Sequence, residues 1–197
     1  MTGILGIALL LPTGIAVFRA SMGTAYVSLL LLSVSLLIGP LNVLWGRPNP
    51  VSADLRRDVG IWAALWGLAH VVFGLQVHLP GRPWEYFLWP AHLGRLVPFR
   101  YDAAGASNHT GLAATLILLA LLAVSNDAAL RRLGTGRWKS VQRWNYVCFA
   151  LVTIHGVIYQ VLEQRAWTWV GVFALTLLTV VVGRVAAWRH LRSRQRH

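Results

Sequence analysis

Two histidines lie inside apolar stretches of the chain, where an ionisable side chain is unexpected. His70 belongs to the apolar run 59–79 and His155 to the run 142–162. An ionisable residue at membrane depth is costly, and it usually has a polar partner or a bound cofactor. Two neutral imidazoles facing each other across an apolar gap are a natural axial pair for haem b, because each offers one nitrogen to the iron. The alternative is that each histidine only forms a hydrogen bond to a neighbouring helix.

The spacing of the sequence places both histidines at similar depth. The third and fifth apolar runs are expected to cross in the same direction, starting near Gly60 and Gln142. At a rise of 1.5 Å per residue, His70 lies ~15 Å and His155 ~20 Å from those starting points. We therefore expect the two imidazoles on parallel helices at matching height.

Three neighbours of these histidines are expected to contact the cofactor. Gly67 precedes His70 by three residues on the same helical face, and Gly156 directly follows His155, so a flat porphyrin could approach either backbone closely. Trp66 lies four residues before His70 and shares its face. The alternative for both glycines is ordinary packing of helices through small residues.

The remaining histidines are weaker candidates. His78, His92 and His109 fall at one end of the expected bundle, where together they could hold a periplasmic metal or a second haem. His190 and His197 belong to a basic tail, which predicts contact with lipid headgroups.

Composition makes the bilayer the expected solvent of the chain. Of 197 residues, 56% are hydrophobic and 12% charged, and the mean hydropathy is +0.58. A spanning helix needs ~20 apolar residues. We therefore predict an all-α integral membrane bundle of six helices, forming a single domain over 1–197. The expected spans are 3–20, 24–45, 59–79, 109–125, 142–162 and 167–188.

The basic residues predict the orientation of this bundle. With the N-terminus inside, 13 of the 18 lysines and arginines fall on the inner side, leaving five outside: Arg19, Arg82, Arg95, Arg100 and Arg165. This asymmetry places both termini in the cytoplasm. The expected location of the bundle is a bacterial inner membrane. It also explains the net charge of +12 through membrane lipid, so nucleic-acid binding is not expected.

Two further features narrow the class of protein. The N-terminal run has no basic residue before it, so it is expected to be a retained span and not a cleaved signal. Cys148 is the only cysteine, which excludes a disulfide framework, a cysteine-rich iron–sulfur site and a Cys-x-x-Cys-His haem attachment. A buried structural thiol is expected there.

Several motifs occur together in the order found in one known family. The run Arg56-Arg57-Asp58-Val59-Gly60-Ile61-Trp62-Ala63, reaching His70 ten residues after the glycine, resembles the third-helix signature of ferric reductase-like transmembrane proteins. Within that group the chain resembles the haem-binding subunit of periplasmic methionine sulfoxide reductase (MsrQ-type). The other matching features lie between 24 and 162: Leu30 to Leu41, Leu119 to Ser125, Arg131-Arg132-Leu133-Gly134, Trp138, Arg143, Tyr146 and His155.

The resemblance implies that His70 and His155 are haem ligands. It also implies how many haems to expect. The family usually has another histidine thirteen residues before the fifth-helix ligand, where this chain has Gln142, and the position thirteen residues before His70 is Arg57. Both partners of an inner haem are absent together, which favours a single haem.

The resemblance further implies electron transfer through the membrane. No flavin or nicotinamide domain and no Gly-x-Gly-x-x-Gly fingerprint follows the last span, so the expected donor is a quinol or a separate cytosolic flavin reductase. The implied acceptor is a periplasmic molybdopterin-containing methionine sulfoxide reductase. Its expected docking surface is the long connection at about 80–108, with Trp84, Tyr86, Trp89, His92 and Arg95.

Two other functions stay open. The first is a ferric or cupric reductase that uses the same haem but passes electrons to a metal ion, with His78, His92 and His109 as the candidate site for that ion. The second is a haem-free transporter or assembly protein whose histidines handle protons. Whether the protein is itself an enzyme, or an oxidoreductase subunit that needs a partner, is not decided by the sequence.

Overall fold

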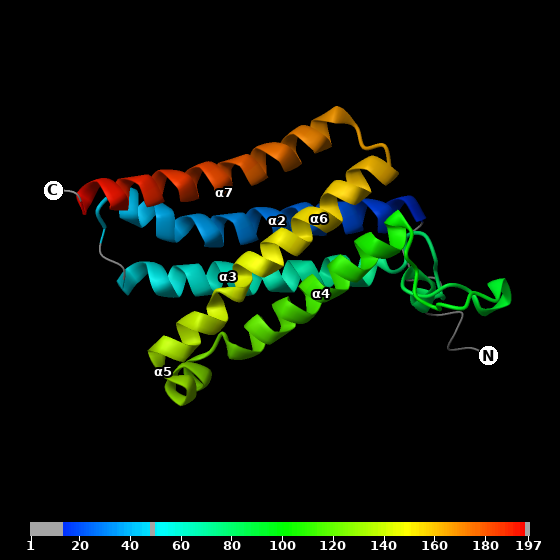
Figure 1. Ribbon diagram of the computed structural model, residues 1–197, viewed down its shortest axis with the longest axis horizontal. Coiled ribbons are helices and arrows are strands. Elements are labelled where there is room, and N and C mark those ends of the chain that lie inside the picture. The colour runs from blue at the N-terminus through cyan, green and yellow to red at the C-terminus, as the bar shows by residue number, and fades with distance from the viewer. Residues whose placement is uncertain (1–13, 48–49, 196–197) are drawn as a thin grey trace.

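The described part of the chain is a bundle of long helices. The computed structural model describes residues 14–47 and 50–195, and Figure 1 shows their arrangement. Within these ranges the structure has no strand, only an isolated bridge between Leu88 and Phe99. The expected all-α class is confirmed for these residues. Four helical segments are long and apolar enough to cross a bilayer: Ile15–Leu44, Ala103–Val124, Asp127–Leu162 and Trp167–Arg194. By length and composition, the chain is a multi-pass membrane protein.

Helix α2 (Gly14–Leu44) runs without interruption through the position where a break between the first two spans was expected. The sequence predicted an interruption near residues 20–24, but the helix is continuous there. A glycine inside a helix costs only about 1 kcal/mol relative to alanine, so Gly23 does not end it. Thr24 donates its hydroxyl proton to the carbonyl of Ala20, one turn earlier, at 2.7 Å, so its side chain is satisfied within the helix. Most of the expected first span, 3–13, lies outside the described residues.

Helix α3 (Pro50–Gly74) is the fifth long helix, although its charged first turns keep it outside the four candidate spans. It lies lengthwise against α2, and two serines of α2 fix the pair. Ser28 donates to the carbonyl of Ala63 at 2.8 Å, and Ser35 donates to the carbonyl of Arg56 at 3.2 Å. Ala63 is fully buried, which lets the two backbones approach closely.

The remaining helices are α4 (Ala103–Val124), α5 (Asp127–Gln142), α6 (Trp144–Leu162) and α7 (Trp167–Arg194). Helix α4 begins six residues before its expected start, because Asp102 caps it by accepting a hydrogen bond from the Gly105 amide at 2.8 Å. Helix α5 occupies most of the segment 126–141, which the expected spans 109–125 and 142–162 left as a connection. Asn126 caps it through the amide of Ala129 at 2.9 Å. Helix α6 begins two residues after the expected start of the fifth span.

The helices alternate in direction. α2, α4 and α7 run one way, and α3 and α6 run the other (Figure 1). α4 packs on α6 and α7 packs on α2, while α3 contacts both α2 and α4. The buried centre includes Leu32, Leu36 and Ala64. Cys148 is fully buried beside the carbonyl of Ala114, as expected of a structural thiol.

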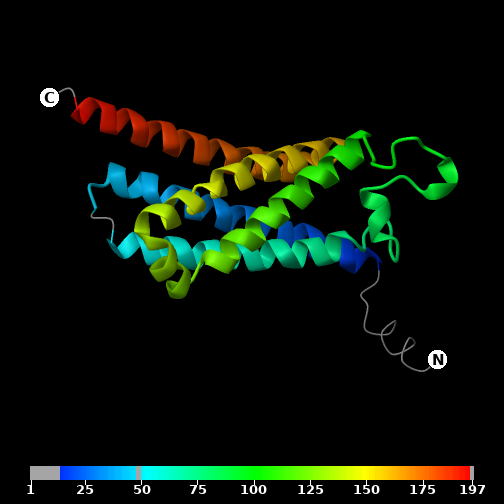
Figure 2. The same ribbon diagram turned by 60° about the horizontal axis from the view of Figure 1, so that its bottom comes forward.

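The two ends of the bundle differ in structure. We call the end with the connection 75–102 the loop end; this connection projects beyond the helices (Figure 2). We call the end with α5 and residue 194 the basic end. The connection contains two 3-10 helices, Pro83–Tyr86 and Ala91–Leu93. Tyr86 is buried beneath it and donates its hydroxyl proton to the carbonyl of Gly74 at 3.0 Å. Tyr86 therefore does not belong to an exposed docking surface.

Candidate cofactor site

His70 on α3 and His155 on α6 face each other inside the bundle. Their ring centroids lie 6.2 Å apart, and the ring planes are inclined by 74°. A metal–imidazole bond of about 2.0 Å plus ~1.1 Å to the ring centre places opposed ligands of one ion roughly 6 Å apart, centroid to centroid. The spacing of the two rings therefore fits one metal ion between them.

Backbone carbonyls of other helices orient both imidazoles. The Nδ1 atom of His70 lies 2.9 Å from the carbonyl oxygen of Ser21 on α2, and that of His155 lies 2.8 Å from the carbonyl oxygen of Ser107 on α4. A carbonyl only accepts, so each Nδ1 carries the proton and donates. The proton-free nitrogen of each neutral ring is then Nε2, which is left for a metal.

The serine hydroxyls add a second contact at each histidine. The Oγ of Ser21 lies 3.2 Å from Nδ1 of His70, and that of Ser107 lies 3.3 Å from Nδ1 of His155. Ser107 also donates to the carbonyl of His155 at 3.0 Å. Sequence reasoning missed both serines, because an anchoring group on the backbone leaves no side-chain signal.

A cavity of about 300 Å³, which we call the histidine cavity, contains the two facing rings. Its walls come from α2, α3, α4, α6, α7 and the connection 75–102, and they are mostly apolar. The apolar residues that line it include Met22, Val71, Leu112 and Val152. A mostly apolar cavity that contains two neighbouring imidazoles is chemically suited to a flat tetrapyrrole with an iron at its centre.

A glycine that was not singled out from the sequence makes room for one ring. A Cβ atom on Gly111 of α4 would lie 2.7 Å from Nδ1 of His155, closer than real Cβ contacts allow. Gly67 and Gly156 line the same cavity, but their nearest neighbours are side chains of adjacent helices. A Cβ on Gly67 would meet Ser28 at 3.0 Å, and one on Gly156 would meet Phe173 at 2.6 Å.

Trp66, also expected at the cofactor, is not among the residues that line the histidine cavity. Its side chain is exposed on the helix surface, like that of Trp62 one turn earlier. A half-exposed indole on a membrane helix is suited to contact with lipid. The structure therefore brings four of the five expected site residues together, and Trp66 lies apart from them.

Within the described part of the chain, one permanent cation lines the histidine cavity, at its loop end. Arg165 is mostly buried, with 14% of its side chain exposed, and its guanidinium lies 4.8 Å from the centroid of the Phe18 ring. Its nearest carboxylate, Glu163, is 3.7 Å away and is also bound by Nε2 of His78 at 2.7 Å. Arg165 therefore keeps part of its charge available to a ligand of the cavity.

The three histidines considered for a second site do not come together. His78 pairs with Glu163, and His92 is exposed in the second 3-10 helix. His109 lies between the rings of Phe87 and Phe99, at centroid distances of 5.8 and 6.2 Å. Among residues 14–47 and 50–195, no group of three or more His, Cys, Asp or Glu side chains is arranged to hold a metal ion.

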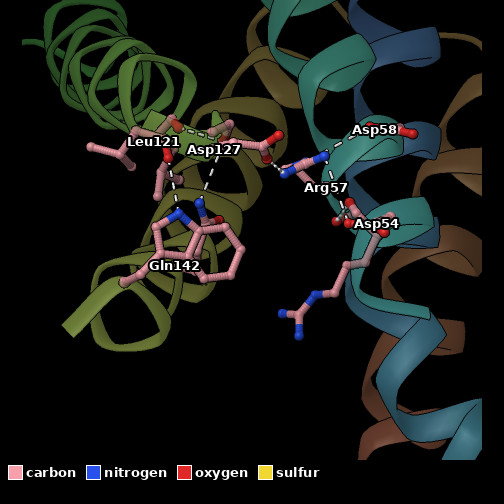
Figure 3. A network of polar contacts seen from close by, with 11 residues as sticks. Asp54, Arg57, Asp58, Leu121, Asp127 and Gln142 are labelled. Atoms are coloured by element: carbon pink, nitrogen blue, oxygen red, sulfur yellow. Dashed lines mark hydrogen bonds and ion pairs between the residues drawn. The ribbon is translucent and has the colours of Figure 1, made fainter. Parts of the chain in front are cut away.

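Arg57 and Gln142 stand where an inner haem would need histidine ligands, and both form other contacts. Arg57 reaches from α3 to Asp127 on α5, with Nη1 and Oδ1 2.6 Å apart (Figure 3). This hydrogen bond raises the pKa of Arg57. Gln142 donates to the hydroxyl of Ser125 at 3.4 Å, and Ser125 in turn donates to the carbonyl of Leu121 at 2.6 Å.

Comparison with known proteins agrees with the resemblance seen in the sequence. The chain is 25% identical over 173 residues to the protein-methionine-sulfoxide reductase heme-binding subunit MsrQ of Yersinia pseudotuberculosis serotype O:1b (strain IP 31758), covering 87% of this chain and 77% of MsrQ. The chain is distantly similar to MsrQ. The MsrQ of Yersinia pestis (strain Pestoides F) matches with the same identity over 87% of this chain and 76% of its own length.

A second kind of relative matches a shorter stretch. Magnetosome protein MamZ of Magnetospirillum gryphiswaldense is 28% identical over 127 residues, which are 64% of this chain. The chain spans only 17% of that protein's length. No family model matches the chain. The similarity to MsrQ therefore carries the functional argument, since it covers most of both proteins.

Proposed function

We propose that the protein is an MsrQ-like membrane subunit that binds one haem b between His70 and His155 and transfers electrons across the membrane. The observation that carries the proposal is the facing pair of imidazoles, whose Nδ1 atoms both donate to carbonyls of neighbouring helices. The distant similarity to proteins named as haem-binding subunits supports it over 87% of the chain.

When bound, haem b supplies one-electron chemistry at its iron. The residues of the chain determine how it is held. The carbonyls of Ser21 and Ser107 keep both rings in the tautomer that leaves Nε2 proton-free. With both His70 and His155 as its ligands, a bound haem would support electron transfer and not oxygen chemistry. Arg165, which lines the cavity, would offer a positive charge to the carboxylates of a bound haem.

The donor and acceptor lie on opposite sides in this proposal. Electrons enter at the basic end from a quinol or a cytosolic flavin reductase. They leave at the loop end to a methionine sulfoxide reductase, the enzyme to which the names of the Yersinia relatives refer. That this acceptor is periplasmic and contains molybdopterin is part of the proposal, which follows the resemblance of the sequence to MsrQ-type subunits. Trp84, His92 and Arg95 are exposed on the connection 75–102 and are the proposed docking residues. In this assignment the basic end is cytoplasmic and the membrane is the bacterial inner membrane.

The direct test is the absorbance spectrum of the purified protein. A reduced-minus-oxidised spectrum with a haem assay should give about one haem b per chain. His70→Ala and His155→Ala should each lose the bis-histidine spectrum, because the remaining ring offers only one axial nitrogen. His92→Ala is the matched control, since this exposed histidine lies away from the cavity, and it should keep the spectrum. Unchanged spectra in both ligand variants contradict the proposal.

The same preparation separates the two alternative functions. A ferric or cupric reductase would reduce chelated metal ions directly, without a protein acceptor. Among the described residues, His78, His92 and His109 do not form a group that could hold a metal ion, so they do not support this alternative. A haem-free transporter or assembly protein would have no Soret band in protein isolated from its native membrane.

A further inference from the structure

A larger cavity, of about 530 Å³, lies at the basic end of the bundle. We call it the basic-end cavity. One part of its wall is apolar, formed by Ile38, Ile61, Leu118, Leu121 and Leu122. The rest is polar and strongly cationic: it includes Arg56, Arg57, Lys139, Arg143 and Arg184, and no acidic residue.

Four of these five cations have no carboxylate partner among the residues that the structure describes. The chain contains six acidic residues, all of them within the described ranges. Three of them converge on Arg57: Asp54 at 3.6 Å, Asp58 at 3.9 Å and Asp127 at 2.6 Å (Figure 3). The other three, Glu85, Asp102 and Glu163, form their ion pairs at the loop end. Arg56, Lys139, Arg143 and Arg184 are thus left to bind an external anion.

The cationic wall is organised and includes neutral hydrogen-bonding groups. The guanidinium of Arg184 lies 4.6 Å from the centroid of the Tyr146 ring, an arrangement that restrains a long side chain. Arg56 is fixed at its backbone by Ser35. Gln142 and the buried Asn145 also line the cavity. A ligand with several anionic oxygens would find both charged and neutral partners there.

We propose that the basic-end cavity binds an anionic phospholipid such as phosphatidylglycerol, with the phosphate among the four unpaired cations. Basic pockets between membrane helices on the cytoplasmic side are suited to anionic headgroups. A free phosphate would leave the wall of Ile38, Ile61 and Leu122 facing water, whereas an acyl chain covers it. The lipid binds without reference to haem, so this proposal can hold whether or not the proposed function does.

The test uses the full chain purified in detergent and freed of lipid. Phosphatidylglycerol, phosphatidylcholine and inorganic phosphate are added separately, and bound ligand is counted by native mass spectrometry. We expect one phosphatidylglycerol to be retained about tenfold more strongly than phosphatidylcholine, with no saturation of the site by inorganic phosphate. The haem spectrum of the same samples reports separately on the proposed function.

Two variants with equal loss of charge isolate the cavity. R56Q/R143Q/R184Q removes three of its cations and should lower phosphatidylglycerol retention to the level of phosphatidylcholine. R131Q/R132Q/R189Q removes three cations of the same end that do not line the cavity, and it should retain the lipid. If the first variant does not fold, Ile61→Trp fills the apolar wall without a change of charge and should also reduce retention.

Three results would overturn the proposal. Equal loss of lipid in both triple variants would mean that only the general charge of this end attracts lipid. Saturation by inorganic phosphate alone would mean a simple anion site. A flavin or quinone that occupies the cavity in a one-to-one ratio, and that R56Q/R143Q/R184Q loses, would assign the cavity to the electron donor.

Discussion

Gly111 lies directly against the imidazole of His155, so close that a Cβ at this position would come within 2.7 Å of Nδ1. That Nδ1 atom is also the one that donates to the carbonyl of Ser107. Both residues belong to α4 and both act on Nδ1 of His155. Gly111 leaves room for the ring, and Ser107 accepts the hydrogen bond from Nδ1. Because the ring of His155 is held from α4, a change in α4 should alter the candidate haem site without touching either histidine.

The first prediction concerns Gly111→Ala. The added methyl group should push the His155 ring off its axis, and overpacking of this kind costs about 1–3 kcal/mol. We expect most of the bis-histidine absorbance to be lost and the thermal midpoint to fall. Gly23→Ala is the matched control, since a Cβ there meets no atom within 4 Å. An unchanged spectrum in Gly111→Ala would mean that His155 is not held as described.

The second prediction concerns Ser107→Ala. The substitution removes the hydroxyl that donates to the carbonyl of His155, but it keeps the backbone carbonyl that orients Nδ1. We therefore expect the haem spectrum to persist and the free energy of unfolding to fall by about 1 kcal/mol. Spectroscopy and thermal unfolding of the same sample would check both parts. Complete loss of haem would show that the hydroxyl, and not the carbonyl, holds the ring.

The sequence predicted the candidate site best where a feature of the site depends on the type of a side chain. His70 and His155 stood out as ionisable groups in apolar runs, and counting residues from Gly60 and Gln142 placed them at similar depth. The structure has their rings 6.2 Å apart on helices that run the same way. Helix periodicity and rise are properties of every α-helix, which is why this geometry could be predicted.

The sequence predicted the candidate site least well where backbone groups or small residues determine how the imidazoles are held. The carbonyl anchors at Ser21 and Ser107 carry no signal in residue type, because any residue has a carbonyl. Gly111 could not be separated from other glycines without knowing which ring lies opposite. Helix α5 was missed because its polar, basic sequence has the composition of a loop, although the Asn126 cap is a helix start signal.

The third prediction concerns pH and Asp102. The hydrogen bond from Arg100 holds the pKa of Asp102 below its usual value, and the amide of Gly105 adds to the effect. A carboxyl whose pKa is lower in the folded state stabilises the fold above its unfolded pKa of about 4. This stabilisation is lost as the pH falls through the lower, folded pKa. Asp102→Asn should therefore reduce the acid sensitivity of the thermal midpoint below about pH 4.

At neutral pH, Asp102→Asn should cost little, because asparagine also caps helices well. Asp102→Ala should cost about 1 kcal/mol through loss of the α4 cap. Thermal unfolding of the three proteins between pH 3 and pH 7 would compare them. A wild-type midpoint that falls no more steeply in acid than that of Asp102→Asn would contradict the stabilising role of this pair.

The last prediction concerns Arg165, the permanent cation that lines the histidine cavity among residues 14–47 and 50–195. A positive charge near the iron disfavours Fe(III) relative to Fe(II), and it also offsets the propionate charges. Arg165→Gln should therefore lower the midpoint potential of the haem while the bis-histidine spectrum remains. Arg165→Lys keeps the charge and should restore most of the potential.

Arg19→Gln is the matched control, because Arg19 is an exposed arginine of the same end that does not line the cavity. A redox titration of the four proteins decides the matter: equal potentials in wild type and Arg165→Gln would mean that the propionates point away from Arg165.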